Sequence, residues 1–210
     1  MSQVAIRPEV LAASLASRLI HDAMGPVSGV VSGLDLFNHS EGEDMRGEAL
    51  ALAASSARQL VDRLAFLRVA WSAGAEAMDT GELERLARNL FIGLRPRLEW
   101  SATIAKLPAV SARTLLGLVH ITADAIAAGG TAVVTANSAG EWSVIRVEAR
   151  GPRLRIPPET LAGLAGEALN GGVPGRWAPA FFLHACVAAA GGSLTTQVDD
   201  FGILFEARLP

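Results

Sequence analysis

The chain has a single cysteine and no surplus of basic residues, and both shortages exclude classes of protein. One cysteine, Cys186, rules out a disulfide within the chain and a metal cluster built on several thiolates. Its apolar neighbours predict a buried, structural thiol. Lysine and arginine number 18 against 21 aspartates and glutamates, which gives a formal net charge of −3. We therefore expect neither nucleic acid nor an anionic membrane surface as a partner.

Long apolar segments are missing as well. No run approaches the roughly 20 residues that a membrane-spanning helix needs. The first ten residues lack the apolar core and cleavage site of a secretory signal. A cytoplasmic location is the resulting expectation. Of the 210 residues, 50% are hydrophobic and 19% charged, a balance typical of a folded protein with one large or two small domains.

The first third of the sequence predicts two long helices. Between Leu15 and Phe37, apolar residues recur at three- and four-residue steps, which marks one face of a helix. The polar, turn-rich segment 38–44 interrupts this pattern, and a second apolar stripe follows from Leu50 to Leu67. Two helices joined by a short turn form an antiparallel hairpin, and we assign residues 1–76 to this helical hairpin domain.

The apolar stripe of this hairpin is too wide for two helices to cover. Two copies of the hairpin that pair with each other would bury the stripe in a four-helix bundle. The sequence therefore predicts a homodimer that forms through residues 8–73.

Residues 77–210 predict a second domain in which helices and strands alternate. Helices are expected at 80–91, with Thr80 as the N-terminal cap, and at 109–130, 157–169 and 176–192. Strands are expected at 97–102, 131–137, 141–150, 193–198 and 202–209. The order α-β-α-β-β-α-α-β-β describes an α+β sandwich with helices on one face of a sheet.

The first helix carries a histidine beside an acid, followed by a proline. Because residues two apart on a helix point about 200° from each other, His21 lies opposite the stripe that holds Leu19 and Ala23. It therefore faces solvent, on a face of small residues that another protein can approach closely. Pro26 has no N–H, so the carbonyl of Asp22 loses its helical partner, and such a proline costs roughly 3 kcal/mol. An exposed His-Asp pair beside this defect suggests a functional site.

The segment RLIHDAMGPVSGV, residues 18–30, resembles the H-box of two-component histidine kinases, in which an acid and then a proline follow the phospho-accepting histidine. The hairpin resembles their dimerisation and phosphotransfer domain, and the second domain resembles their ATP-binding domain in its element order. The segments AIAAGGTAVV and ARGPRLRIP add to this likeness. The whole chain resembles the ChpT-type histidine phosphotransferases of alphaproteobacteria. The resemblance implies that His21 carries a phosphoryl group between receiver-domain aspartates in a phosphorelay.

A kinase of the resembled type needs asparagines for Mg²⁺, an aspartate-glycine motif for adenine and a glycine-rich lid for the phosphates. The two asparagine positions correspond to Gly117 and Ile121, and Arg150 precedes Gly151 where the aspartate is needed. The glycines of 171–175 form no lid motif. These differences predict no ATP binding, no autokinase activity and no cofactor of the protein's own, with Mg²⁺ supplied by the partner receiver domain.

The resemblance assigns roles to particular residues. His21 is the expected phosphate carrier, and Asp22 is expected to accept a hydrogen bond from the imidazole and so fix its tautomer. Arg150 and Arg153 belong to a basic cluster that is either a solvated strand edge and loop or a surface that steers an acidic receiver. The partners implied are the receivers of response regulators and of a hybrid histidine kinase. The expected docking face consists of Met24, Gly25, Ser28 and Ser32.

Other functions fit the same residues. An atypical histidine kinase with an unusual nucleotide pocket would label itself with ATP. An adaptor would bind receivers without transferring phosphate. A phosphatase would need a polar side chain at the fourth position after His21 to orient water, and Gly25 at that position argues against it.

Overall fold

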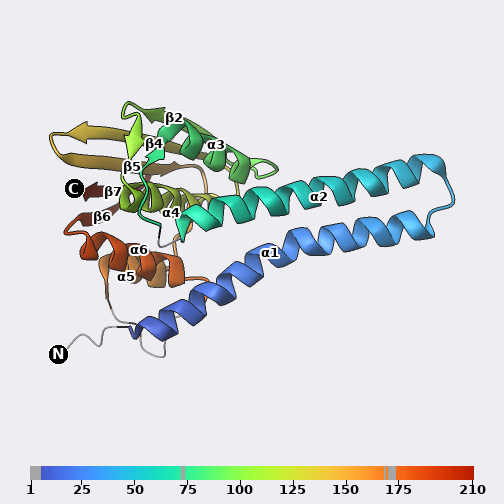
Figure 1. Ribbon diagram of the computed structural model, residues 1–210, viewed down its shortest axis with the longest axis horizontal. Coiled ribbons are helices and arrows are strands. Elements are labelled where there is room, and N and C mark those ends of the chain that lie inside the picture. Colours follow the sequence, from blue (N-terminus) through green and yellow to red (C-terminus); the bar gives the residue numbers. More distant parts are fainter. Residues whose placement is uncertain (1–5, 72–73, 168, 170–173) are drawn as a thin grey trace.

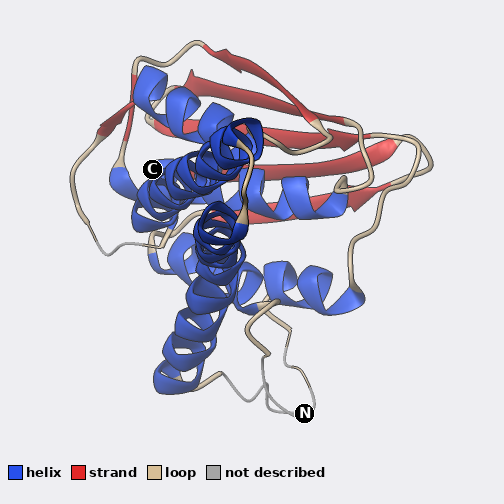
Figure 2. Ribbon diagram, turned by 90° about the vertical axis from the view of Figure 1, so that its right-hand side faces the viewer, coloured by secondary structure: helices blue, strands red, loops and turns tan. Residues whose placement is uncertain are grey.

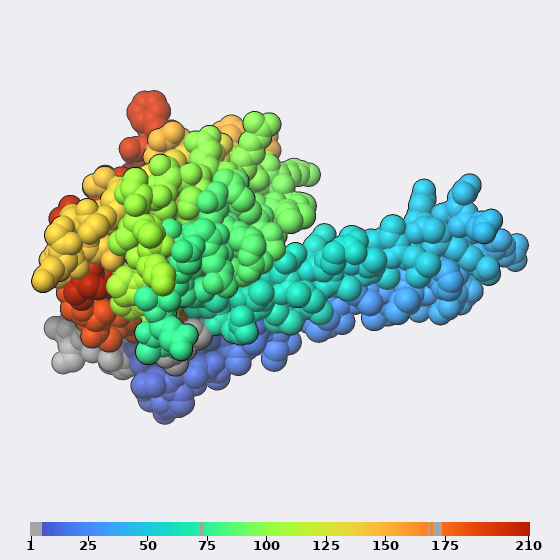
Figure 3. Space-filling view, turned by 45° about the horizontal axis from the view of Figure 1, so that its top comes forward, coloured from blue at the N-terminus to red at the C-terminus, as the bar shows by residue number. Residues whose placement is uncertain are grey.

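A long helical hairpin projects from an α/β domain in the computed structural model, which describes residues 6–71, 74–167, 169 and 174–210 (Figure 1). The hairpin consists of α1 (Pro8–His39) and α2 (Glu43–Ala70). Its outer end stands clear of the rest of the chain, as Figure 3 shows in light blue. No helix in the described part of the chain combines the length and the apolar character that crossing a membrane requires.

The first helix runs without interruption through its internal proline. Pro8 begins the helix, where a missing N–H costs nothing because the first turn has no acceptor for it. Pro26 leaves the carbonyl of Asp22 without its usual partner, and Nη1 of Arg63 on α2 donates to that carbonyl at 3.4 Å. A side chain from the second helix therefore occupies the hydrogen-bonding position that the proline leaves open.

Three glycines of α1 serve two different purposes. A Cβ on Gly33 would lie 2.7 Å from the backbone nitrogen of Ala53 and 2.8 Å from the carbonyl oxygen of Ala49. A Cβ on Gly29 would collide with the side chain of Ser56, whereas nothing lies within 4 Å of one on Gly25. Gly29 and Gly33 thus allow α1 to approach α2 closely, and Gly25 leaves an open surface.

Replacing Gly33 with alanine is expected to lower the free energy of unfolding by about 1–3 kcal/mol, because the two helices must separate. The matched change Gly25→Ala meets no atom, and alanine is the better helix former. Urea denaturation followed by circular dichroism measures both variants. Equal effects of the two substitutions would contradict this account of the α1–α2 contact.

The second domain is built on a five-stranded sheet in the order β2-β4-β5-β7-β6. Strand β2 pairs parallel with β4, and the other neighbours are antiparallel. The sheet joins the two predicted hairpins, β4–β5 and β6–β7, through the pairing of β5 with β7. Its strands are β2 (Arg97–Ala102), β4 (Thr131–Ala139), β5 (Trp142–Arg150), β6 (Ser193–Val198) and β7 (Gly202–Leu209).

Helices cover one face of this sheet and leave the other open, as Figure 2 shows. Along β5, Ser143, Ile145, Val147 and Ala149 are buried, and the residues between them face the open side. Helix α4 is buried along most of its length between the sheet and the other helices. The helices are α3 (Thr80–Phe91), α4 (Ala109–Ala125), α5 (Pro158–Ala165) and α6 (Ala178–Ala189).

The structure confirms the predicted order of these elements, but the helix predicted at 109–130 ends at Ala125. It also corrects two further details. Asp79, not Thr80, caps α3: its carboxylate accepts the N–H of Gly81, while the Thr80 hydroxyl donates to the carbonyl of Ile104 at 2.7 Å. A small second sheet pairs β1 (Met78–Asp79) with β3 (Lys106–Leu107), and the sequence does not predict it. Two-residue strands are too short for any periodic pattern.

The base of the hairpin belongs to the core of the α/β domain. Phe66, Leu67 and Ala70 at the end of α2 are buried in the main hydrophobic cluster. The first turns of α1 pack on α6, where Leu11 and Leu15 contact a smaller cluster around Phe181. Because one core spans both parts, the division into residues 1–76 and 77–210 stays a prediction.

Candidate functional site

His21 and Asp22 occupy opposite environments on α1. The side chain of His21 is 83% exposed, and that of Asp22 is 5% exposed. The exposure of His21 confirms the orientation that helical geometry predicts for it. Asp22 follows about 100° further around the helix and therefore points inward. The carboxylate Oδ1 of Asp22 lies 3.3 Å from Nδ1 of His21. An exposed imidazole is thus held from behind by a buried carboxylate.

Asp22 is in turn fixed by a largely buried arginine, whose side chain is 12% exposed. Nε of Arg18, one turn earlier on α1, donates to Oδ2 of Asp22 at 2.9 Å. Nη2 of the same guanidinium donates to Oδ2 of Asp124 on α4, also at 2.9 Å. Burial lowers the pKa of Arg18, but Asp124 and Asp22 outweigh it and leave the pKa above its ordinary value. Arg18 therefore ties the helix that carries His21 to the second domain.

His120 on α4 completes this group of side chains. Its Nε2 lies 3.4 Å from Nη2 of Arg18 and 3.7 Å from Oδ2 of Asp22. Its ring packs against Phe66 and Trp71, with centroids 6.0 and 5.9 Å away. Burial, helped by the charge of Arg18, lowers the pKa of His120. Because a guanidinium can only donate, Nε2 of His120 accepts from Arg18, and the ring lies directly beside Asp22.

Neither Arg18 nor Asp124 is a site residue in the sequence prediction. The spacing of Arg18 and Asp22 by four residues is a signal for an ion pair on one helix face. Asp124 lies 106 residues from Arg18, and no local pattern connects positions so far apart.

This geometry favours one nitrogen of His21 as a nucleophile. When Nδ1 carries the proton it donates to Asp22, and Nε2 then keeps its lone pair. Within the described residues Nε2 has no hydrogen-bond partner. Asp22 also stabilises the positive charge that develops on the ring when Nε2 forms a new bond. The arrangement suits attack on an electrophile brought by another molecule.

The four predicted docking residues are all exposed on α1, on the side that His21 faces. Beside Gly25 a groove of about 280 Å³ runs between the hairpin and the loop after α3. Arg63 and Gln59 of α2 line it, together with Ile92 and Leu94 of the loop, which are 60% and 39% exposed. These four residues cannot be identified from the sequence, since the topology alone brings the loop to the hairpin.

The structure does not bring Arg150 to the face that carries His21. Arg150 projects from the open side of β5, where its Nε and Nη2 each donate to Glu148 at 2.6 Å, and these bonds raise its pKa. Its neighbour Arg146 pairs with Glu206 at 2.6 Å. Arg153 is exposed and forms no ion pair with any described residue. Part of the predicted basic cluster is therefore neutralised by neighbouring glutamates.

Two of the predicted nucleotide positions, Gly117 and Gly151, are closed by packing. A Cβ on Gly117 would lie 2.8 Å from Cδ1 of Leu183 and 3.0 Å from its Cγ, so no asparagine fits there without movement. A Cβ on Gly151 would lie 2.8 Å from the carbonyl oxygen of Gly129. Residues 170–173 belong to the segment in which the sequence shows no lid motif, and they lie outside the described residues. Among those described, no group of three His, Cys, Asp or Glu side chains is placed to hold a metal ion.

Two comparisons bear on the whole chain. It is 28% identical to the protein phosphotransferase ChpT of Brucella abortus (strain 2308) over 201 residues, which covers 94% of this chain and 95% of the relative. A solved structure described as a bacterial phosphotransferase matches with a TM-score of 0.87 and 27% identity, covering 98% of this chain and all of the other.

More distant similarity concerns the fold alone. The catalytic domain of the histidine kinase ThkA matches with a TM-score of 0.52 and 16% identity, over 65% of this chain and 95% of that domain. The second domain thus has the fold of histidine-kinase catalytic domains. The family model "Histidine phosphotransferase C-terminal domain" matches residues 80–201, more than half of the sequence. The chain therefore belongs to the histidine phosphotransferase family.

Proposed function

We propose that the protein relays a phosphoryl group between receiver-domain aspartates, with His21 as the carrier. The observation that supports this most strongly is the exposed imidazole of His21, whose Nδ1 lies 3.3 Å from the buried carboxylate of Asp22. Membership of the histidine phosphotransferase family and similarity to ChpT support the same chemistry. The partners are receiver domains of response regulators, one of which is part of a hybrid histidine kinase.

The proposed transfer exchanges one bond for another. Nε2 of His21 attacks the phosphorus of an aspartyl phosphate in line with the leaving carboxylate, so a P–O bond breaks as an N–P bond forms. The proton on Nδ1 stays hydrogen-bonded to Asp22, which stabilises the positive ring. The receiver leaves with a free carboxylate. The reverse sequence passes the phosphoryl group to the aspartate of a second receiver.

The protein supplies position and charge, and the receiver supplies Mg²⁺ in this proposal. No ATP binding is proposed either, in keeping with the close packing of Leu183 against Gly117. We also place the protein in the cytoplasm, because the receivers that it would serve act there. An atypical kinase would incorporate label from ATP at His21, whereas the proposed relay incorporates label from a phosphorylated receiver only. Incubating the protein separately with each labelled donor decides between them.

The proposed receiver-binding surface extends beyond the four docking residues of α1. Ile92 and Leu94 flank the groove beside Gly25 and offer exposed apolar contacts next to the small residues of the helix. A receiver that covers both would bring its aspartyl phosphate to His21 from the solvent side. Arg153 can still attract an acidic partner over a distance.

Replacing Ser28 with tryptophan is expected to reduce transfer from a receiver at least about tenfold, because the bulky ring occupies space that the partner needs. Ser28 is exposed, so the hairpin itself should keep its stability. Transfer is measured with a labelled phosphorylated receiver. The control Glu41→Trp places the same ring in the turn at the distant end of the hairpin. An unchanged rate for Ser28→Trp would contradict docking at this face.

The homodimer is proposed to form through an apolar face of the hairpin that a single chain leaves exposed. By helical geometry this face lies away from His21, so pairing leaves the imidazole accessible. Burying such a face is favourable at about 25 cal/mol per Å². Its members, exposed by 37–67%, are Leu19, Ile20, Val27, Val31 and Leu34 of α1 and Leu50, Val61 and Leu64 of α2.

The double change Val27→Asp, Leu64→Asp is expected to convert a dimer to a monomer, because pairing would bury four uncompensated charges per dimer. Sedimentation equilibrium measures the molecular mass of both proteins. The control Ser32→Asp adds a charge on the side of α1 that His21 faces and should leave the dimer intact. A monomeric parent protein, or an unaffected mass in the double variant, would overturn this interface.

A further inference from the structure

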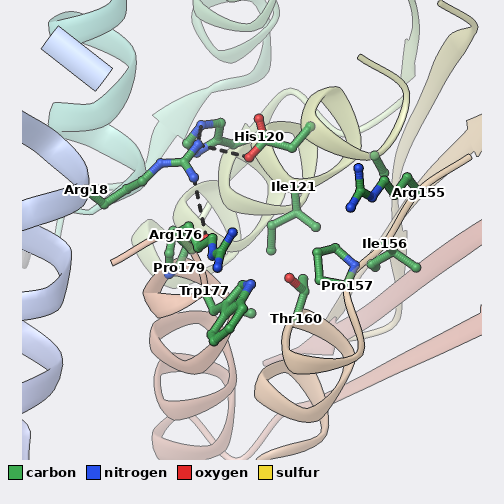
Figure 4. A pocket seen from close by; sticks show the side chains of 13 residues that line it. Arg18, His120, Ile121, Arg155, Ile156, Pro157, Thr160, Arg176, Trp177 and Pro179 are labelled. Atoms are coloured by element: carbon green, nitrogen blue, oxygen red, sulfur yellow. Dashed lines mark hydrogen bonds and ion pairs between the residues drawn. The ribbon is translucent and has the colours of Figure 1, made fainter. Parts of the chain in front are cut away.

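A cavity of about 190 Å³ lies between α1, α4, α5 and α6, on the inner side of the Arg18 ion pairs. Figure 4 shows Arg176 and Arg155 on opposite sides of it, with Ile121, Pro157 and Thr160 between them. The relay of phosphate through His21 makes no use of this space. We call this space the Arg18 cavity.

The charges around the Arg18 cavity are unbalanced in favour of cations. Arg18 is compensated by Asp22 and Asp124. Arg155 and Arg176 line the cavity too, and neither forms an ion pair with any residue that the structure describes. The guanidinium of Arg176 is held over the ring of Trp177, 4.6 Å from its centroid. Two guanidinium groups are thus available to an anion, and one of them is already positioned.

Most of the remaining lining is apolar, with His120 and Thr160 as its further polar residues. Ile121, Ile156 and Pro157 form one part of it, and Pro179 and Ala180 at the start of α6 form another. A cavity with apolar walls and a few positioned polar groups is the usual form of a small-molecule site. Its volume suits a small ring, since an apolar cavity of about 150 Å³ holds benzene. Inorganic anions alone would leave this apolar surface uncovered.

We propose that the Arg18 cavity binds a small organic anion, a phosphate or carboxylate on a compact apolar body. Its anionic group would lie between Arg155 and Arg176, and its apolar part against Ile121 and Pro157. The same ligand would affect Arg18, which lines the cavity and also holds Asp22. An anion that attracts Arg18 weakens its hold on Asp22, so occupancy would tune the relay. This last link rests on the proposed function of His21, whereas binding does not.

Titration calorimetry with phenyl phosphate on the full chain tests the binding. We expect saturable binding with one site per chain, and affinities at least about tenfold lower for inorganic phosphate and for benzyl alcohol, which each lack one half of the probe. Arg155→Gln and Arg176→Gln should each weaken binding about tenfold or more, as for a lost charge-assisted hydrogen bond. The control Arg150→Gln changes an arginine outside the cavity and should leave the affinity unchanged.

The coupling to Asp22 is tested by the same measurement. Because coupling between two sites is reciprocal, Asp22→Asn should free Arg18 for the anion and tighten phenyl phosphate binding about threefold or more. Unchanged affinity in that variant would overturn the coupling. Absence of saturable binding, indifference to Arg155→Gln and Arg176→Gln, or tighter binding of Mg·ATP than of the probe would overturn the site itself. None of these readouts depends on phosphotransfer.

Discussion

Replacing His21 with alanine is expected to abolish the transfer of phosphate from a phosphorylated receiver, to below about one part in a thousand of the parent rate. The imidazole is the only group at this surface position that can form the N–P bond in the proposed reaction. Its side chain is 83% exposed and contributes little to the core, so the variant should fold normally. The measurement is the decay of a labelled receiver and the appearance of label on this protein.

A measurement of receiver binding distinguishes the loss of the phosphate carrier from a docking defect. The His21→Ala variant should bind an unphosphorylated receiver within about threefold of the parent affinity, because the docking residues are untouched. His39→Ala, at the exposed end of α1, is the matched control and should transfer at the parent rate. Continued relay between receivers by His21→Ala would mean that another group carries the phosphate.

Replacing Asp22 with asparagine is expected to slow transfer roughly 100-fold or more, the range for losing a group that assists proton placement. The amide can hold the ring in place but brings no negative charge to stabilise the positive imidazole. It also leaves Arg18 with Asp124 as its one carboxylate partner among the described residues. Single-turnover transfer from a labelled receiver measures the rate.

A loss of structure would mimic this result, so the variant needs a stability check. Breaking a buried ion pair by removing one partner costs about 3–5 kcal/mol, and denaturation shows whether Asp22→Asn remains folded under assay conditions. Asp44→Asn removes a carboxylate from the exposed first turn of α2 and should change neither stability nor rate. Parent-like transfer by a folded Asp22→Asn protein would remove Asp22 from the mechanism.

Strands with a clear period are predictable from this sequence almost to the residue, whereas the helix predicted at 109–130 ends at Ala125. The predicted strands 97–102, 193–198 and 202–209 coincide with β2, β6 and β7. Short elements are harder to predict, because β1 and β3 span two residues each. The N-cap of α3 is Asp79, one position before the predicted Thr80. Both residues are good caps, and only the structure shows that the Thr80 hydroxyl donates to Ile104.

The candidate site is predictable in part. His21 and Asp22 follow from helical geometry and from the spacing to Pro26. The support behind them, Arg18 with Asp124 and His120, depends on how α4 packs against α1, and the sequence carries no local sign of that contact. The glycines show the same limit. Gly25 and Gly33 look alike in sequence, yet a Cβ added to Gly25 would meet nothing within 4 Å, whereas one on Gly33 would lie within 3 Å of α2.

The most direct test of the central claim is to locate the phosphate that a phosphorylated receiver delivers to this protein. The account predicts an acid-labile, base-stable phosphate on a single residue, His21, with the donor receiver losing label at the same rate. Phosphate on any other residue, or label that arrives from ATP and not from the receiver, would contradict it.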